Sequence, residues 1–548
     1  MEPGVYGVVN FLDWHLVFGR VDGLSKIFGF IMTLMCCVGT LYGLHEKRAK
    51  DHMATWFYVA GSLGTIYCGD YLTLFVFWEL MAFASVFLIW FRRRPQSMAI
   101  GYRYLLVHTF GGLLLLGGFM LRYYQTGGDL SFGQLNVHDP SLYTWLIMLG
   151  FILNAAVPPL HSWLPDAYGE ASVPGAIFMC AFTTKTAIYT LARSCAGFEI
   201  LVPLGVIMAL YGVVYAVLEN DCRRLLAWHI ISQVGYMVAG VGIGTQLAIN
   251  GACAHAFAHI LYKGLLFMGC GSVLHMTGKS KFTELGGLYK KMPRTFVYTM
   301  IGGLSISAFP LFSGFVSKSM IIAAGFESHI LWAGFLLTLA SAGTFLHTGL
   351  KVPYFIWFGK NNCSKETWEK AQDPPWNMQA AMFAAAFLCT LIGCYLPFLY
   401  DKLPYPNHYH PYNAYHLAET FQILLFTAFG FFLLLKKLAP EAKISIDLDW
   451  FYRKGAKIFM WVVRHPIQAV DTAWSYAYRD IGIAGGMLNA KFWSWFDWNV
   501  IDTIVDGIAR TVRTIGGTVR RLQSGQMQYN IFFAATIMAA AIFAFVFA

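Results

Sequence analysis

Residues 249–275 read INGACAHAFAHILYKGLLFMGCGSVLH, and this stretch decides how the rest of the chain is interpreted. It is long and apolar enough to cross a bilayer, because about 20 helical residues span the hydrocarbon core. Three basic side chains interrupt it, at His255, His259 and Lys263. Their spacing of four residues puts all three on one face of a helix. The stretch is therefore predicted to be a membrane helix that carries a basic stripe.

The position of Lys263 near mid-membrane restricts what the stripe can be. A charge there costs at least a few kcal/mol if it meets lipid, so this side chain must face protein or water. Burial also favours the neutral amine, and two imidazoles that titrate near neutral pH lie on the same stripe. This combination indicates a path for protons. The alternative is that His255 and His259 are core residues that hydrogen-bond to neighbouring helices.

The composition indicates a polytopic membrane protein. The chain has 548 residues, of which 57% are hydrophobic and only 12% are charged. Its 11 cysteines are scattered, without a CxxC pair or the spacing of an iron–sulfur or zinc site. The sequence also has no Walker loop and no dinucleotide fingerprint. We therefore predict no cofactor, no metal site and no redox or nucleotide site in this chain.

Apolar runs predict an all-α fold with about 14 membrane helices. Lys and Arg side chains concentrate in alternate loops, which the positive-inside rule assigns to the cytoplasm. Both termini are then expected on the outer face. The predicted spans are 25–45, 53–69, 71–91, 101–122, 143–160, 173–192, 200–218, 225–244, 249–275, 295–323, 329–350, 377–400, 415–436 and 530–548.

Two apolar segments are interrupted by proline, at 154–165 (NAAVPPLHSWLP) and 305–318 (SISAFPLFSGFVSK). Proline removes a backbone donor and breaks the helical ladder. At membrane depth, irregular backbone is tolerated only where it faces protein or a wet cavity. Two such segments, each followed by a lysine, suggest an internal repeat and mark transport sites in known transporters. The alternative for each segment is a simple proline kink.

Further ionisable residues lie within the predicted spans. Glu79, Lys185, Lys318 and His229 each need a partner or a proton. In a medium of low dielectric, protonation of one such group can drive a proton off the next. The alternative is a set of static buried ion pairs. Lys351, in contrast, lies near the cytoplasmic end of a span and is interpreted as snorkelling to the headgroups, with His347 nearby.

Residues 440–529 differ from the rest, because apolar and basic residues alternate at helical period. An apolar stripe runs from Val500 to Ile515, and arginines such as Arg510 and Arg513 occupy the other faces. The pattern predicts an amphipathic helix that lies along the membrane surface, followed by a final membrane helix at 530–548.

Six stretches resemble one known family, in the family's order. They are FVFWEL around Glu79, PPLHSWLPDAYGEASVPGAIF at 158–178, TTKTAIYTLAR around Lys185, NDCRRLLAWHIISQVGYM around His229, AHILYKGLLFMGCGSV around Lys263 and SAFPLFSGFVSK ending at Lys318. The chain is similar to the antiporter-like membrane subunits shared by respiratory complex I, Mrp-type Na+/H+ antiporters and energy-converting hydrogenases.

The resemblance implies two inverted five-helix repeats, each with one broken helix. It also implies that protons pass along Glu79, Lys185, His229, His255, His259, Lys263 and Lys318. The sequence departs from the family at three points. Asn154 stands where the family has the lysine that pairs with the glutamate, so either Glu79 pairs with Lys185 instead or the first half-channel is altered. The family's first two helices are missing, and another subunit is expected to supply them. Arg223 replaces a usual lysine.

The C-terminal part is similar to the end of the distal antiporter-like subunit of complex I, where a lateral helix braces neighbouring subunits. We divide the chain into an N-terminal segment with the first helix, two antiporter-like halves, accessory helices, the lateral segment and a last membrane helix. The corresponding ranges are 1–52, 53–192, 193–350, 351–437, 438–529 and 530–548.

The predicted function is proton translocation, or Na+/H+ exchange, by a membrane subunit of a multisubunit complex. A redox module on partner chains or an opposing cation gradient would drive it. Because the chain is predicted to have no redox or nucleotide site of its own, it would be at most a subunit of an ion-translocating oxidoreductase. Its partners are expected to be the lipid bilayer and subunits of an Mrp-like or complex I-like assembly, without nucleic acid, in a bacterial inner membrane. The alternatives are a structural subunit with an inactive channel and a proton-coupling subunit of an inorganic-carbon uptake complex.

Overall fold

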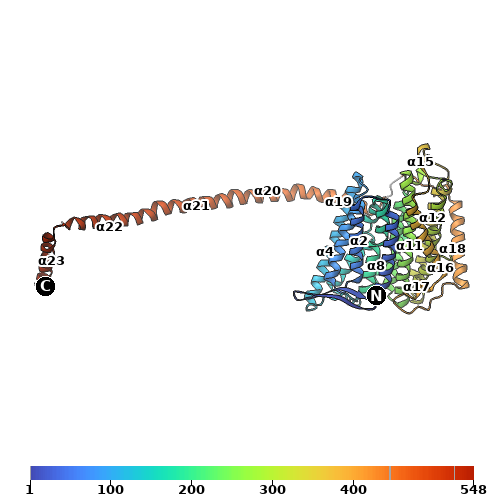
Figure 1. The fold of residues 1–548 in the computed structure, drawn as a ribbon, viewed down its shortest axis with the longest axis horizontal. Coiled ribbons are helices and arrows are strands. Elements are labelled where there is room, and N and C mark those ends of the chain that lie inside the picture. The colour runs from blue at the N-terminus through green and yellow to red at the C-terminus, as the bar shows by residue number, and fades with distance from the viewer. Residues whose placement is uncertain (1, 443–445, 524, 548) are drawn as a thin grey trace. The chain divides into compact units, whose positions relative to one another are not determined.

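The computed structural model describes residues 2–442, 446–523 and 525–547, and it is almost entirely helical (Figure 1). The chain divides into two units, Met1–Asp449 and Trp450–Ala548. The first unit is a bundle of membrane helices, and the second is a series of helices in which no described side chain is buried.

The first part of the bundle contains the first interrupted segment. Helix α5 ends at Asn154 and α6 begins at Trp163, so the break predicted at 154–165 is confirmed. A second interruption, at Phe182 between α7 and α8, was not predicted. The helices are α1 (Gly23–Gly43), α2 (Ala49–Tyr67), α3 (Tyr71–Trp90), α4 (Pro95–Gln125), α5 (Leu142–Asn154), α6 (Trp163–Glu170), α7 (Val173–Ala181) and α8 (Thr183–Ser194).

The next part contains the basic stripe and the second break. The stripe lies on α11, whose described side chains are almost all buried. The predicted break at 305–318 is confirmed, because α12 ends at Ile306 and α13 begins at Ser313. The elements are α9 (Leu201–Leu218), α10 (Cys222–Ile243), α11 (Gln246–Thr277), the 3₁₀ turns η1 (Phe282–Glu284) and η2 (Leu288–Lys290), α12 (Pro293–Ile306), α13 (Ser313–Glu327), α14 (Leu331–Thr344), and the π-helical segments η3 (Phe345–Lys351) and η4 (Tyr354–Phe358).

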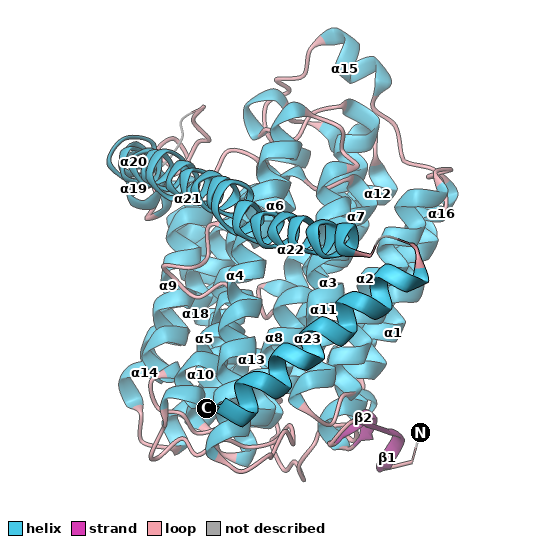
Figure 2. Cartoon of the chain, turned by 90° about the vertical axis from the view of Figure 1, so that its left-hand side faces the viewer, coloured by secondary structure: helices cyan, strands magenta, loops and turns pink. Residues whose placement is uncertain are grey.

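Four further helices complete the first unit: α15 (Lys365–Lys370), α16 (Trp376–Cys394), α17 (Pro397–Tyr400) and α18 (Ala414–Leu433). An N-terminal hairpin was not predicted, because residues 1–22 contain no long apolar run. It pairs β1 (Gly4–Phe11) with β2 (Trp14–Val21) in antiparallel register. The hairpin and α15 lie at opposite ends of the bundle (Figure 2).

In the part of the chain that the structure describes, eleven helices are long and apolar enough to span a membrane. Three predicted spans differ for local reasons. Helix α2 begins with charged residues, α5 has only 13 residues, and the span predicted at 295–323 is divided into α12 and α13. The count of 14 and the inverted repeat stay predictions.

Helices α9 and α10 pack closely because small residues line their contact. A Cβ at Gly235 would lie 2.5 Å from the carbonyl oxygen of Gly205 and 2.6 Å from the amide nitrogen of Ala209. Both atoms belong to the backbone and cannot move aside. The glycine therefore sets the distance between α9 and the helix that carries His229.

Hydrogen bonds hold the last residues of the first unit against the bundle. His161 lies 3.2 Å from the Asp447 carboxylate, and the Tyr211 hydroxyl donates to the same oxygen. The Tyr215 hydroxyl donates to the carbonyl of Ile446 at 2.8 Å. Burial by itself raises the pKa of Asp447, but the bonds from His161 and Tyr211 outweigh it, so the pKa lies below its ordinary value.

The second unit is helical from Trp450 to Leu522, with three π-helical stretches, and then contains a separate apolar helix. Its residues follow the predicted amphipathic pattern, since the apolar side chains of Ile501, Ile504, Val505 and Ile508 are exposed within this unit. The elements are α19 (Asp449–Val462), η5 (Val463–Ile467), α20 (Gln468–Tyr476), η6 (Ala477–Ile483), α21 (Ala484–Phe496), η7 (Asp497–Ile501), α22 (Asp502–Leu522) and α23 (Met527–Phe547).

Candidate functional site

Lys263 and His229 form a fully buried hydrogen bond between two membrane helices. Lys263 lies in the middle of α11, and its Nζ is 3.0 Å from Nδ1 of His229 on α10. Both side chains have no exposed surface. An imidazolium has no acceptor, so in this bond a charged Lys263 requires a neutral His229. The pair can therefore hold one proton in either of two places.

His347 extends this pair, although it was not predicted as a site residue. Its ring centroid lies 4.9 Å from that of His229, and the side chain is buried. It lies in η3, where the helix changes from α- to π-helical hydrogen bonding. Single π-helical turns are frequent at functional sites. The sequence offers only one usable signal, a histidine inside an apolar span.

His255 connects four helices through polar side chains. Its Nδ1 is 3.2 Å from the Ser317 hydroxyl on α13, and its Nε2 is 3.2 Å from Oε1 of Gln233 on α10. The amide of Gln233 in turn donates to the Thr344 hydroxyl on α14 at 3.3 Å. Sequence analysis missed Gln233 and Ser317, because neither residue is ionisable.

His259 lies between the two preceding groups and is the least satisfied of the histidines on α11. Its ring is 6.1 Å from that of His255 and 5.3 Å from that of Tyr262. Among the described residues, no protein group hydrogen-bonds to either ring nitrogen. The interpretation of His259 as a core histidine satisfied by neighbouring helices is therefore wrong for this residue.

The Lys318 ammonium hydrogen-bonds to backbone that the second helix break exposes. Its Nζ donates to the carbonyl oxygen of Ile306, the last residue of α12, at 3.2 Å, and to the Ser341 hydroxyl at 3.4 Å. It also lies 5.4 Å from the centroid of the Tyr236 ring. The break frees the Ile306 carbonyl from the helical ladder, so it can accept from a buried ammonium.

Lys185 follows the same principle at the interruption that was not predicted. Helix α7 ends just before Phe182, and the Lys185 ammonium donates to the carbonyl of Cys180 at 2.6 Å and to the Thr184 hydroxyl at 3.1 Å. It is fully buried and close enough to Lys263 and His259 for electrostatic interaction. We refer to Lys185, His229, His255, His259, Lys263, Lys318 and His347 as the polar row.

Glu79 does not pair with Lys185, so that alternative is wrong. Throughout the described chain Glu79 makes no ion pair, and its Oε1 has no hydrogen-bond partner. The Lys185 ammonium is instead occupied by backbone and hydroxyl oxygens. Asn154 is buried and equally without a partner. The other alternative, an altered first half-channel, stays a prediction.

Comparison with known proteins places this site in a family. The profile of the NADH:quinone oxidoreductase/Mrp antiporter transmembrane family matches residues 68–344. The chain belongs to this family. Its match therefore includes both broken helices and every residue of the polar row except His347.

Individual relatives agree with the family. The chain is 30% identical over 387 residues to the D-type Na(+)/H(+) antiporter subunit of Alkalihalophilus pseudofirmus, which covers 66% of this chain and 78% of that protein. It is 33% identical over 343 residues to the A-type antiporter subunit of the same organism, covering 56% of this chain and 42% of that protein. The chain thus spans about half the length of the A-type relatives it matches.

Among solved structures, the fold is similar to that of a chain in the membrane-bound sulfane sulfur reductase, an archaeal respiratory membrane complex. The TM-score is 0.67 at 22% identity, and the match covers 99% of this chain and 91% of the other. The protein is an integral membrane protein of this family, with the family's fold.

In this family member Lys351 does not snorkel. Its side chain is 1% exposed, and its Nζ donates to the carbonyls of Val217 at 2.5 Å and Glu219 at 2.9 Å, at the end of α9. A cation is favoured there by the helix dipole and by the unsatisfied carbonyls. Arg223 satisfies the end of α6 in the same way, because its guanidinium donates to the carbonyl of Ala171 at 2.8 Å.

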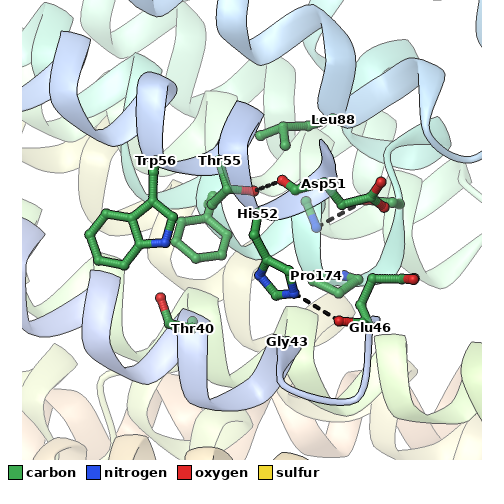
Figure 3. A pocket seen from close by; sticks show the side chains of 13 residues that line it. Thr40, Gly43, Glu46, Asp51, His52, Thr55, Trp56, Leu88 and Pro174 are labelled. Atoms are coloured by element: carbon green, nitrogen blue, oxygen red, sulfur yellow. Dashed lines mark hydrogen bonds between the residues drawn. The ribbon is translucent and has the colours of Figure 1, made fainter. Parts of the chain in front are cut away.

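A pocket at the junction of α1, α2, α3 and α7 contains charged groups outside the polar row (Figure 3). Arg48 lies 2.8 Å from both Glu46 and Asp51. His52 is 2.8 Å from the carbonyl of Glu46, and Thr55 donates to the carbonyl of Asp51 at 2.8 Å. The hydrogen bonds from Arg48 lower the pKa of Glu46. The two acidic groups that line this pocket are thus both paired with Arg48, which lies outside its lining.

Proposed function

We propose that this chain is the ion-translocating membrane subunit of a multisubunit complex and that protons move along its polar row. The observation that carries the proposal is the 3.0 Å bond between Lys263 and His229, both fully buried and in contact with further histidines. A buried lysine whose partner can accept its proton is suited to transfer. A static ion pair would instead need a carboxylate.

The row supplies proton-carrying groups at short intervals. A proton on Lys263 passes to His229 and from there to His347, whose ring is adjacent. On the other side, His259 and His255 lead to Ser317 and Lys318 on α13. Glu79 and Lys185 belong to the first half. Each transfer changes the charge beside the next group, and in low dielectric this change favours the following transfer.

The partners and the energy source follow from the same proposal. The chain would work with other membrane subunits of an Mrp-like or complex I-like assembly, in a bacterial inner membrane with both termini outside. Either a redox module on partner chains or a cation gradient would drive the protons, with Na+ as the exchanged ion in the second case. The position of the N-terminal hairpin, at the other end of the bundle from α15, supports the orientation of the N-terminus.

The direct test uses everted membrane vesicles that contain the intact complex and a fluorescent reporter of ΔpH. Lys185→Ala and His229→Ala are expected to lower the proton flux by at least about tenfold while the complex still assembles. Lys290→Ala, a change in an exposed cation of the loop before α12, is the matched control and should transport normally. Assembled variants that transport at the wild-type rate would instead support a structural subunit with an inactive channel.

The energy source is tested by gentle purification of the tagged chain and mass spectrometry of what accompanies it. Iron–sulfur or hydrogenase-type subunits would identify a redox-driven pump. Small membrane subunits alone would identify a gradient-driven antiporter, and a partner that hydrates or captures CO2 would identify the inorganic-carbon alternative.

A further inference from the structure

Three polar side chains meet where α3, α4 and α5 pack together, two of them fully buried and the third half-buried. They are Glu79 on α3, His108 on α4 and Asn154 at the end of α5. His108 and Asn154 have no exposed surface, and their side-chain nitrogen and oxygen atoms make no hydrogen bond of good geometry to described protein groups, although the two side chains lie close enough to interact with each other. Buried polar atoms are nearly always satisfied, by protein or by ordered water. We refer to these three residues as the first-half cluster.

The geometry brings the members of the cluster together. A Cβ at Gly112 would lie 1.9 Å from Oε1 of Glu79, so the carboxyl group occupies the space beside this glycine of α4. Gly112 is one helical turn after His108 and shares its helix face, so the carboxyl group and the imidazole lie on the same side of α4. The Asn154 amide lies close enough to the His108 ring to interact with it. Water molecules would find several polar partners in this space.

Aromatic rings hold the imidazole of His108 in place. The Tyr104 ring centroid lies 4.1 Å from that of His108, and the Trp163 ring centroid lies 4.5 Å from it. The indole N–H of Trp163 is fixed by the carbonyl of Leu153 at 3.1 Å. These contacts fix the ring through its faces and edges and leave both nitrogens available.

Hydroxyl groups continue from the cluster to Lys185. The Tyr104 hydroxyl is 2.9 Å from that of Ser85 and also interacts with that of Thr183. The Thr183 hydroxyl is 2.6 Å from that of Tyr58. The next residue, Thr184, accepts from the Lys185 ammonium at 3.1 Å. A hydroxyl can donate and accept at once, so these hydroxyls can pass a proton as far as Thr183, the residue next to the Thr184 that bonds Lys185.

We propose that His108 is the proton-carrying residue between Glu79 and the hydroxyl groups that lead to Lys185. The Glu79 carboxylic acid gives its proton to one ring nitrogen, directly or through water. The imidazolium then releases the proton of its other nitrogen toward Tyr104, which restores a neutral imidazole, and no electrons are transferred. Asn154 cannot carry a proton, so it orients the ring and the water. This inference rests on the proposed function of the polar row.

The alternative role for His108 is aromatic packing, and His108→Phe separates the two. Phenylalanine keeps the ring between Tyr104 and Trp163 but cannot take up a proton. Proton flux of the purified complex in liposomes is expected to fall by at least about tenfold. In His108→Phe/Asn154→Lys an amine returns to the same polar space, and flux is expected to recover to within about threefold of wild type. His138→Phe, the same substitution at an exposed histidine of the loop before α5, is the control and should transport at the wild-type rate.

The outcomes separate this inference from the function on which it rests, with Lys263→Ala measured in parallel. Wild-type flux in His108→Phe together with lost flux in Lys263→Ala would overturn the role of His108 alone. Wild-type flux in Lys263→Ala would overturn the proposed function and this inference with it. Should His108→Phe fail to assemble, His108→Gln keeps a polar side chain that takes up no proton, and the same criteria apply to it.

Discussion

Asp22 joins the N-terminal hairpin, the first membrane helix and the helix that carries Lys185, so its removal gives a quantitative test of the fold. Its carboxylate accepts two bonds of 2.8 Å from the Arg193 guanidinium, near the end of α8. It also caps α1 by accepting from the amide of Ser25 at 2.9 Å. Asp22→Asn keeps the capping ability, because Asn is as good a cap as Asp, and removes the charge.

The magnitude follows from the pKa of Asp22. Partial burial by itself raises this pKa, but the hydrogen bonds and charge of Arg193 lower it from 3.8 to about 2. A decrease of about 1.8, at about 1.36 kcal/mol per unit, corresponds to about 2.4 kcal/mol. The Asp22 side chain is 34% exposed, so solvent screening reduces this value to about 1–2 kcal/mol.

The sign follows from linkage. The folded-state pKa of Asp22 is lower than the unfolded one, so the ion pair stabilises the fold above about pH 4 and is lost as the pH falls toward 2. Unfolding titrations with SDS in mixed micelles, followed by tryptophan fluorescence, should give Asp22→Asn a free energy of unfolding about 1–2 kcal/mol below wild type at pH 7. Asp22→Ala should lose about 0.5–2 kcal/mol more, because the cap is lost as well.

The reasoning would be refuted by one of two results. Asp22→Asn could match wild type at pH 7, which would mean that the ion pair adds nothing. Alternatively, the difference could persist unchanged at the lowest pH at which the wild type remains folded. An effect on the charge would disappear there, whereas a change in packing would not.

Three further predictions concern the scaffold. Gly235→Ala should force α9 and α10 apart and lower the free energy of unfolding by about 1–3 kcal/mol in the same titration. Gly507→Ala, in open space on α22, is the control and should raise helicity measured by circular dichroism. Equal effects at the two positions would contradict the packing argument. Lys351→Met should cost about 1–3 kcal/mol by leaving the end of α9 without its donor, and an unchanged stability would favour snorkelling after all. Asp447→Asn should speed protease cleavage at residues 446–449 at neutral pH, where the lowered pKa keeps the wild-type carboxylate charged, and equal cleavage rates would show that the charge does not hold this segment.

Sequence reasoning succeeded where a pattern is enforced by the membrane itself. The apolar length of 249–275 and the three basic residues on one face predicted α11 and its buried stripe. Prolines in the segments at 154–165 and 305–318 predicted both breaks, because the missing backbone donor acts locally. Such features depend on the residue itself and its near neighbours, so they can be read without knowing the fold.

Features that depend on tertiary contacts could not be predicted in this way. The interruption at Phe182 contains no proline or glycine, and its freed carbonyl is satisfied by Lys185 within the fold. The π-helical segment that turns His347 toward His229 depends on the packing of α14 against its neighbours. Lys351 was assigned to the headgroups because its distance from the end of α9 is not visible in the sequence.

The first half was the least predictable part of the site. The family pattern suggested a partner for Glu79, and the sequence offered Lys185 as a replacement. Nothing in the sequence distinguishes His108, because a single histidine in an apolar span is most often a core residue. Only the packing of α3, α4 and α5 shows that Glu79 lies on the same side of α4 as His108 and that Asn154 lies near its ring.

The measurement that tests the central claim most directly is proton translocation by the purified complex in liposomes, with wild type compared with Lys263→Met. Methionine fills a similar volume but holds no proton, and the bond to His229 is lost. With the complex fully assembled and its driving reaction supplied, the proposal predicts a fall in proton flux of at least about tenfold. Wild-type flux from an assembled Lys263→Met complex would contradict it, because the central transfer step would then be unnecessary.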